Sequence, residues 1–269
     1  MCRAPWVFVW LALCPADWAQ TTPAREAPFY TSESIVNAAT GTPGPLAPNA
    51  LGSIYGRDLS FVTRALGPDD LRGDTLPTAL IGTGVRVLIG SISVPVLFVS
   101  PVQINFLVPP NMRVGRHKLQ VIHNARSGPE VDLELTETAP GAFQLDPRYL
   151  VATHGDGRLV DQEAPAKPGQ VLILYASGLG QTVPKLISLT IPRAPAQIEK
   201  LGEFRVTLNG TPVAQTDILY AGLCPGFAGL YQINLRIPAD APEDPELRLH
   251  IGGRESPGRL RILLRRPLQ

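Results

Sequence analysis

The sequence predicts an all-β protein built from two tandem β-sandwich domains that follow a signal peptide. Three observations predict it: the density of turn-forming residues, an internal repeat, and short runs of alternating apolar residues. The chain contains 28 Pro and 25 Gly in 269 residues, which favours turns and short strands over long helices. It is 44% hydrophobic and 17% charged, against roughly 25% charge in an average soluble domain, so it can bury two cores.

The internal repeat is the strongest signal. Pro48–Leu59 matches Pro168–Leu179, with Pro, Tyr and Leu in common, 120 residues later. At the same offset, Val85–Gly90 matches Arg205–Gly210. A fixed offset held over some forty residues indicates that one structural unit is duplicated.

Farther along the chain the offset grows to 129 residues. Gln103–Pro109 then matches Gln232–Pro238, and Ser127 pairs with Ser256. The second copy therefore carries nine extra residues, which fall in the glycine-rich segment Ala221–Tyr231.

Each copy is expected to consist of short strands separated by turns. Val131–Leu135 and Arg259–Ile262 alternate charged and apolar residues, as half-buried strands do. In the first copy the expected strands are Leu51–Tyr55, Val85–Ile89, Val94–Val99, Ile104–Val108, Lys118–His123 and Val131–Leu135. In the second copy they are Val171–Tyr175, Phe204–Leu208, Ile218–Tyr220, Tyr231–Ile237, Leu247–Ile251 and Leu260–Leu264. Roughly six or seven strands in about 100 residues is typical of an immunoglobulin-like sandwich.

Residues 1–20 are expected to be a signal peptide, with a cation at Arg3 before the apolar run Trp6–Leu13. That run is far shorter than the roughly 20 residues that span a bilayer, so no transmembrane segment is expected in the mature chain. The further boundaries expected are an N-terminal linker at 21–33, the first sandwich at 34–138, a linker at 139–147 and the second sandwich at 148–269. Removal of the leader would leave one cysteine, Cys224, and no Trp.

The charge pattern argues against a nucleic-acid partner. The formal net charge is +1 and the Arg residues are scattered, whereas a phosphate backbone calls for a concentrated positive field. The densest basic cluster is expected to form the exposed face of an edge strand. It consists of Arg259, Arg261, Arg265 and Arg266.

Several longer motifs resemble the Solibacter-type uncharacterised C-terminal domain family. They are Ser34–Ala39, Gly52–Gly56, Val99–Phe106, Ala139–Phe143, Tyr175–Gly180 and Ala221–Asn234. The resemblance covers the chain from about residue 33 to its end. It implies a secreted β-rich module that recurs in exported proteins of acidobacteria, and it brings no established activity and no catalytic residues. The sequence departs from the family pattern at Val102, at Cys224 and in Thr153–Arg158.

Two amide pairs occupy equivalent positions in the copies: Gln103 with Asn105, and Gln232 with Asn234. Strand alternation puts both members of a pair on one face, and an amide side chain both donates and accepts hydrogen bonds. We expect these amides to latch a neighbouring loop or the other domain, and the alternative is a ligand-reading surface.

The inserted segment Ala221–Tyr231 is expected to be a turn-rich loop, because it lacks the Lys and Ser/Thr of a phosphate-binding loop. It is the leading candidate for a domain contact or a partner surface, through Leu223, Cys224, Phe227 and Tyr231. No His or cation lies near Cys224 in the sequence to lower its pKa, so an inert, packed thiol is expected.

His154, Asp156, Asp161 and Glu163 form a short polar cluster. Its spacing does not match an EF-hand, and a hairpin turn at Asp156 explains it. A weak calcium site at Asp156 and Asp161 is the alternative. Ser177 lacks the preceding Gly of a nucleophile elbow and is expected to be a turn serine.

The sequence favours a non-enzymatic exported binding or adhesion-type module, in the periplasm, on the cell surface or outside the cell. Its expected partner is a protein or a surface polymer, and no cofactor is expected. Carbohydrate is the weaker expectation, because the mature chain has no Trp and most other aromatic residues lie in strands expected to be buried. The alternatives are a secreted or periplasmic hydrolase with a site near His154 and Asp156, and a purely architectural envelope protein.

Overall fold

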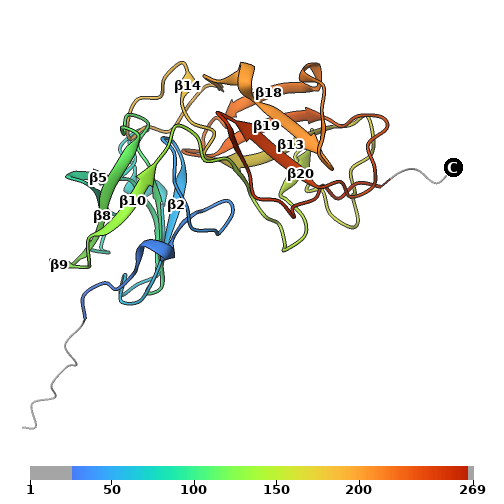
Figure 1. Ribbon diagram of the computed structural model, residues 1–269. Helices are drawn as coiled ribbons and strands as arrows, with labels where there is room; N and C mark the ends of the chain where they lie inside the picture. Colours follow the sequence, from blue (N-terminus) through green and yellow to red (C-terminus); the bar gives the residue numbers. More distant parts are fainter. Residues whose placement is uncertain (1–25, 266–269) are drawn as a thin grey trace, which may run out of the picture.

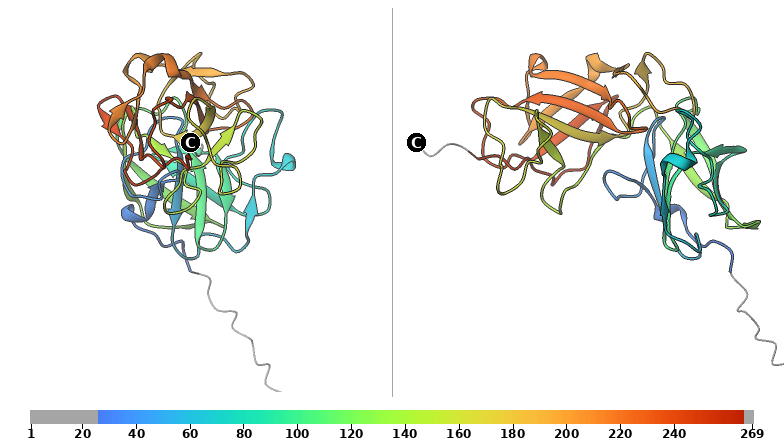
Figure 2. Two further views of the ribbon diagram at one scale, coloured as in Figure 1. Left: turned by 90° about the vertical axis from the view of Figure 1, so that its right-hand side faces the viewer. Right: turned by 180° about the vertical axis from the view of Figure 1, so that it is seen from behind.

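The computed structural model describes residues 26–265, and in it the chain forms two β-sandwiches with separate cores. One core extends from Tyr30 to Leu135 and the other from Ala142 to Leu264. We call these halves repeat 1 and repeat 2. They meet at one end and diverge away from it (Figures 1 and 2).

The regular structure of residues 26–265 is β-strand, apart from four short 3-10 turns. These are η1 (Ser32–Ser34), η2 (Pro68–Asp70), η3 (Leu201–Glu203) and η4 (Gln215–Asp217). The all-β prediction is confirmed. Within the described residues, no helix has the length and apolar character needed to cross a membrane. The expected leader at residues 1–20 lies outside the described part of the chain.

Repeat 1 packs two antiparallel sheets face to face. The first has the order β1-β2-β7-β6-β3 and the second the order β10-β8-β4-β5, with β9 paired to β8. The first sheet comprises β1 (Ile35–Asn37), β2 (Leu51–Tyr55), β3 (Arg64–Ala65), β6 (Val96–Val99) and β7 (Gln103–Leu107). The second comprises β4 (Val85–Ile89), β5 (Ile92–Val94), β8 (Gly115–His123), β9 (Arg126–Ser127) and β10 (Val131–Leu135). Ile54 and Phe106 from one sheet meet Val87 and Val121 from the other in a fully buried core.

Repeat 2 has the same two-layer construction. Its larger sheet has the order β11-β13-β19-β18-β15-β14, with β12 paired to β13, and its smaller sheet the order β17-β16-β20-β21. The larger sheet comprises β11 (Gly141–Ala142), β12 (Ala152–His154), β13 (Val171–Ser177), β14 (Thr182–Val183), β15 (Ala196–Ile198), β18 (Ile218–Leu223) and β19 (Tyr231–Arg236). The smaller comprises β16 (Arg205–Leu208), β17 (Thr211–Pro212), β20 (Leu247–Ile251) and β21 (Arg254–Glu255).

The two repeats share one topology. The order β1-β2-β7-β6-β3 corresponds to β11-β13-β19-β18-β15, and β5-β4-β8 corresponds to β17-β16-β20. The parallel bridge between Leu46 and Leu135 recurs between Ala166 and Leu264. The topology therefore agrees with the internal repeat found in the sequence.

Three local expectations were wrong. Val94–Val99 is not one strand, because Pro95 interrupts it: Val94 ends β5, and Val96–Val99 forms β6 in the other sheet. Leu260–Leu264 does not form a regular strand but makes isolated bridges, because Arg261 and Leu264 bridge to Tyr149, Glu246 and Ala166, which lie on different segments. The equivalent of Ser256 is Gly128, not Ser127. The N–H of Ser256 donates to Leu249 O at 2.8 Å, and the N–H of Gly128 donates to Val121 O at 2.9 Å. The offset at this turn is therefore 128 residues.

Both segments expected to be linkers contribute to the sandwiches. In 139–147, Gly141 and Ala142 form β11 and extend the larger sheet of repeat 2. In 21–33, Tyr30 is buried in the core of repeat 1. Its hydroxyl donates to Pro129 O and accepts from Val121 N, both at 2.6 Å, and burial raises the pKa of Tyr30 to about 12.

The repeats contact each other through backbone hydrogen bonds and ion pairs. Leu76 N–H donates to Leu189 O at 2.7 Å, and Arg193 is paired with Asp74 in the same region. The hydroxyl of Thr138 donates to Ile251 O at 3.1 Å. These contacts join loops that are far apart in the sequence, so they fix the orientation of the repeats.

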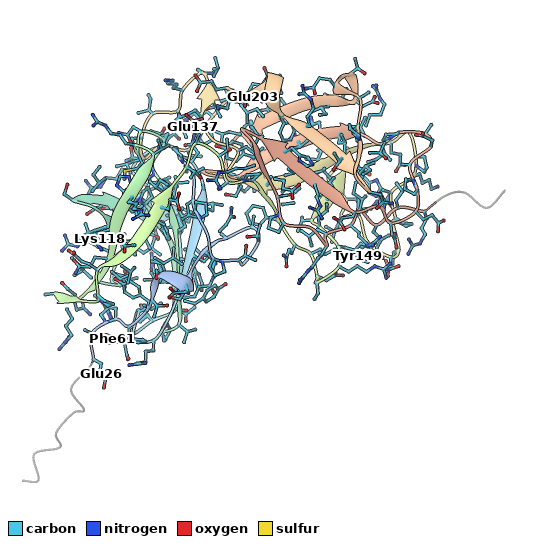
Figure 3. The ribbon with its side chains drawn as sticks, in the orientation of Figure 1. Glu26, Phe61, Lys118, Glu137, Tyr149 and Glu203 are labelled. Atoms are coloured by element: carbon cyan, nitrogen blue, oxygen red, sulfur yellow. The ribbon has the colours of Figure 1, made fainter. Side chains whose placement is uncertain are left out.

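An exposed ion-pair cluster lies at the same junction. Lys200 Nζ is 2.7 Å from an oxygen of Glu137 in repeat 1 and 3.8 Å from an oxygen of Glu203 in repeat 2. Figure 3 shows the two carboxylates near one another where the repeats meet. Because solvent screens exposed ion pairs, this cluster adds little to the stability of the junction.

Candidate binding surface

The amides of repeat 1 lie on the outer face of its first sheet. Ile104 and Phe106 of β7 point into the core, so alternation directs Gln103 and Asn105 outward. Gln103 Nε2 donates to Asn105 Oδ1 at 2.8 Å, and the hydroxyl of Ser53 on β2 donates to the same oxygen at 2.8 Å. The amides therefore hold each other in fixed orientations across two strands, and neither bonds a backbone group of the other repeat.

Repeat 2 carries the amide pair without the hydroxyl, because Ile173 lies across from Asn234 where Ser53 lies across from Asn105. Gln232 Nε2 donates to Asn234 Oδ1 at 2.7 Å. Tyr175 pairs with Gln232 across β13 and β19, as Tyr55 pairs with Gln103 across β2 and β7. The duplication has thus preserved a tyrosine beside an amide pair, in the same register.

A second aromatic side chain flanks each amide pair on the opposite side. Phe98 pairs with Asn105 in repeat 1, and Tyr220 pairs with Asn234 in repeat 2. Both positions follow a β-bulge, which re-aims a side chain relative to a regular strand. We call the outer surface formed by this tyrosine, amide pair and second aromatic the amide–aromatic face of each repeat.

Three aromatic side chains are more exposed than the sequence predicted. Tyr55 is 44% exposed, Phe29 46% and Phe227 59%. The guanidinium of Arg57 stacks on the Phe29 ring, 3.9 Å from its centre, and the main chains of these two residues bond each other. Tyr55 therefore lies next to an exposed aromatic and cationic group at the free end of repeat 1.

The inserted loop of repeat 2 covers the other end of this face. A Cβ at Gly229 would lie 2.6 Å from Leu107 Cδ1 and 2.8 Å from Leu51 Cγ, so the loop backbone rests directly on these side chains. Leu107 is almost fully buried yet does not belong to the core of repeat 1. Its counterpart in repeat 2 is Arg236, which is exposed and paired with Asp217 at 3.3 Å.

Comparison of the two copies in the sequence could have found this exchange of Leu for Arg, which indicates that the face is covered in one repeat and open in the other. An apolar residue is required where a loop covers the face, and a charged one is tolerated where the face is open. Ser177 reinforces the covered end, since its buried hydroxyl accepts the N–H of Leu51 at 2.9 Å.

The segment Ala221–Tyr231 is not a loop throughout, because Ala221–Leu223 belongs to β18 and Tyr231 begins β19. The four residues named from it take different positions. Leu223 and Tyr231 are buried in the core of repeat 2, whereas Phe227 is exposed. Cys224 is half-buried, and burial raises the pKa of its thiol. The hydroxyl of Tyr231 donates to Gly180 O, and burial also raises the pKa of Tyr231.

The polar cluster near His154 is engaged in turns. Asp156 accepts the N–H of Arg158 at 3.0 Å, and Asp161 accepts the N–H groups of Glu163 and Ala164 at 2.9 Å. A ring nitrogen of His154 lies 3.0 Å from Ala164 O. Within residues 26–265, no three His, Cys, Asp or Glu side chains are grouped in the manner of a metal site.

One carboxylate that sequence analysis did not single out organises the C-terminal segment. Asp244 accepts a hydrogen bond from Tyr149 OH at 2.8 Å and from Arg148 at 3.2 Å, and it is paired with Arg265. Desolvation favours its neutral form, but the bonds from Tyr149 and Arg265 outweigh it, and the pKa of Asp244 lies below its usual value. Arg265 of the basic cluster thus serves an internal contact.

No protein-family model matches the chain, and no curated protein matches it. Solved structures match it at low similarity. SGBP-B of the Bacteroides ovatus mixed-linkage glucan utilization locus, in complex with a mixed-linkage heptasaccharide, is 10% identical with a TM-score of 0.37, over 91% of this chain and 47% of that one. The chain thus spans about half the length of that protein.

Two further solved structures match the chain at low similarity. The γ-CGTase of alkalophilic Bacillus clarkii is 11% identical with a TM-score of 0.28, over 89% of this chain and 27% of that one. The tandem Ig repeats of Dlar are 11% identical with a TM-score of 0.21, over 90% of this chain and 96% of that one. Since each TM-score is below 0.5, the function proposed next rests on the geometry of this chain.

Proposed function

We propose that this protein is a non-enzymatic, exported binding module that engages a protein or a surface polymer through the outer faces of its two repeats. One observation carries the proposal: the same amide–aromatic face occurs in both repeats, outside their cores, in one register. A rigid sandwich that presents oriented polar and aromatic groups is suited to recognition.

Export enters this proposal from the predicted leader at residues 1–20 and from the resemblance to a secreted module family. The contacts between the repeats supply the second support. Because they hold the sandwiches in one orientation, the two faces act on a partner as a single bivalent unit.

The test is binding of the purified protein to the insoluble envelope fraction of the producing organism. Wild type is compared with the double variant Gln103→Ala/Gln232→Ala. The control is Ile92→Ala, which changes an exposed side chain on β5, in the other sheet of repeat 1. Saturable binding that the double variant loses and Ile92→Ala keeps is the expected result.

Treatment of the envelope identifies the partner class. Protease sensitivity indicates a protein, and periodate sensitivity indicates a polysaccharide. Either result supports a binding module. Absence of saturable binding, or equal binding by wild type and the double variant, contradicts the proposal.

A further inference from the structure

The amide–aromatic face of repeat 1 leaves one donor and one acceptor unused. Asn105 Oδ1 already accepts from Gln103 and Ser53. Within residues 26–265, Gln103 Oε1 and Asn105 Nδ2 meet no hydrogen-bond partner. Because the other half of each amide is fixed, these two atoms keep their positions on the surface.

A ligand for this face must both donate and accept hydrogen bonds. A sugar hydroxyl does both, and neighbouring hydroxyls on a pyranose ring present a donor and an acceptor together. The paired residues of β2, β7 and β6 on this face carry no charge, from Leu51 to Tyr55 and from Gln103 to Leu107. The cations at its edges are already engaged, since Arg57 stacks on Phe29 and Arg236 of repeat 2 is paired with Asp217. The face therefore matches a neutral ligand better than a phosphate or carboxylate group.

The tyrosine adds an apolar surface beside these atoms. Tyr55 lies directly across from Gln103 and is 44% exposed. An amphipathic ring of this kind suits a ligand that has an apolar face and a polar rim, and a pyranose has both. The exposure of Tyr55 thus removes, for repeat 1, the main sequence-based argument against carbohydrate.

Repeat 2 offers a second copy of the same groups. Gln232 donates to Asn234 at 2.7 Å, Tyr175 lies across from Gln232, and Tyr220 across from Asn234. Within the described residues, Gln232 Oε1 and Asn234 Nδ2 also meet no partner. The second face differs in detail, since Tyr175 OH lies 3.3 Å from the hydroxyl of Thr153 and Tyr220 OH donates to Leu223 O. Two related sites on one unit still match a ligand that itself repeats.

We propose that the two amide–aromatic faces are paired subsites for a neutral, hydroxyl-rich polysaccharide, an inference that rests on the proposed function. Bivalent binding to one long chain raises the effective affinity above that of either face. Each face alone binds weakly, because it is shallow and makes few contacts.

The test is affinity gel electrophoresis of the full chain in gels that contain mixed-linkage β-glucan, xyloglucan or dextran. Polygalacturonate serves as the acidic comparison. We expect at least one neutral polymer to retard wild type. Gln103→Ala and Tyr55→Ala should each weaken that retardation about tenfold, the effect of losing one well-placed contact.

Ile92→Ala is the matched control, since it removes an exposed side chain from the other sheet of repeat 1 and should be retarded like wild type. Thermal unfolding checks that each variant is folded. Tyr55→Ala keeps the test decisive even if an amide variant is unstable, because the Tyr55 side chain is largely exposed.

Failure of every neutral polymer to retard wild type would overturn the inference, as would equal retardation of wild type and Tyr55→Ala. Retardation by polygalacturonate alone would overturn it too, because it would require an acidic ligand. Protease-sensitive binding to the envelope, without retardation by a neutral polymer, would leave the binding module intact and reject its polysaccharide ligand.

Discussion

Replacement of Gly229 by Ala should loosen the contact between the repeats. Gly229 has φ 73, and its added Cβ would lie 2.6 Å from Leu107 Cδ1 and 2.8 Å from Leu51 Cγ. The left-handed conformation costs an L-residue about 1–2 kcal/mol. Overpacking against buried side chains costs about 1–3 kcal/mol more. We therefore expect Gly229→Ala to lower the free energy of unfolding by about 2–5 kcal/mol.

Gly226→Ala separates these two effects. Gly226 lies in the same loop with φ 85, but a Cβ there meets no atom within 4 Å. It should incur the conformational cost alone, about 1–2 kcal/mol. Urea unfolding followed by circular dichroism measures both variants. Hydrogen exchange of the Leu51 amide, which bonds Ser177, reports on the contact itself.

The difference between the two variants is the decisive quantity. An excess loss of about 1–3 kcal/mol in Gly229→Ala, with faster exchange of the Leu51 amide, is expected. Equal losses in both variants, with unchanged exchange, would refute the conclusion that the inserted loop rests on Leu51 and Leu107.

Three further predictions concern titratable groups. Asp244→Asn should cost about 1–3 kcal/mol at pH 7. The folded-state pKa of Asp244 is lowered. The stability that its carboxylate contributes is therefore present above about pH 4 and is lost as the pH falls through the folded pKa. The acid unfolding curves of Asp244→Asn and wild type should converge at low pH. Tyr30→Phe should lower the free energy of unfolding by about 1–3 kcal/mol, because it leaves Val121 N–H and Pro129 O without their hydrogen-bond partner. The control Tyr55→Phe should have almost no effect on urea unfolding. The pKa of Tyr30 is raised to about 12. The stability that its hydroxyl contributes is therefore complete below about pH 10 and lost as the pH approaches 12. A free energy of unfolding that stays constant over that range would contradict this prediction. Burial raises the pKa of the Cys224 thiol. Cys224 should therefore react with a disulfide reagent at pH 8 far more slowly in the native protein than in urea. Equal rates would show that the thiol is open to solvent.

The sequence predicted much of the fold because the strand pattern is local. The expected strands Leu51–Tyr55, Val85–Ile89, Val131–Leu135 and Leu247–Ile251 occur with those limits, since apolar alternation and adjacent turn residues specify them. Leu260–Leu264 was predicted to be a strand and is not one, because alternation cannot show that its bridge partners lie on different segments. The β11 strand was missed because its two residues, Gly141 and Ala142, carry no alternation.

The candidate surface was predicted only in part. The sequence identified Gln103 and Asn105, but it could not tell that they bond each other and Ser53 across neighbouring strands. It also suggested that most aromatic residues would be buried, and Tyr55 is not. Exposure depends on which neighbour covers a strand end, and that neighbour is distant in the sequence.

By itself, the sequence determined that the chain is all-β and that one unit occurs twice, because strand periodicity and a constant offset are properties of neighbouring residues. The tertiary structure decided which faces remain open. The inserted loop covers Leu51 and Leu107 in repeat 1, whereas the equivalent Arg236 of repeat 2 stays exposed. Burial of this kind arises when surfaces far apart in the chain come together, so no local pattern could specify it.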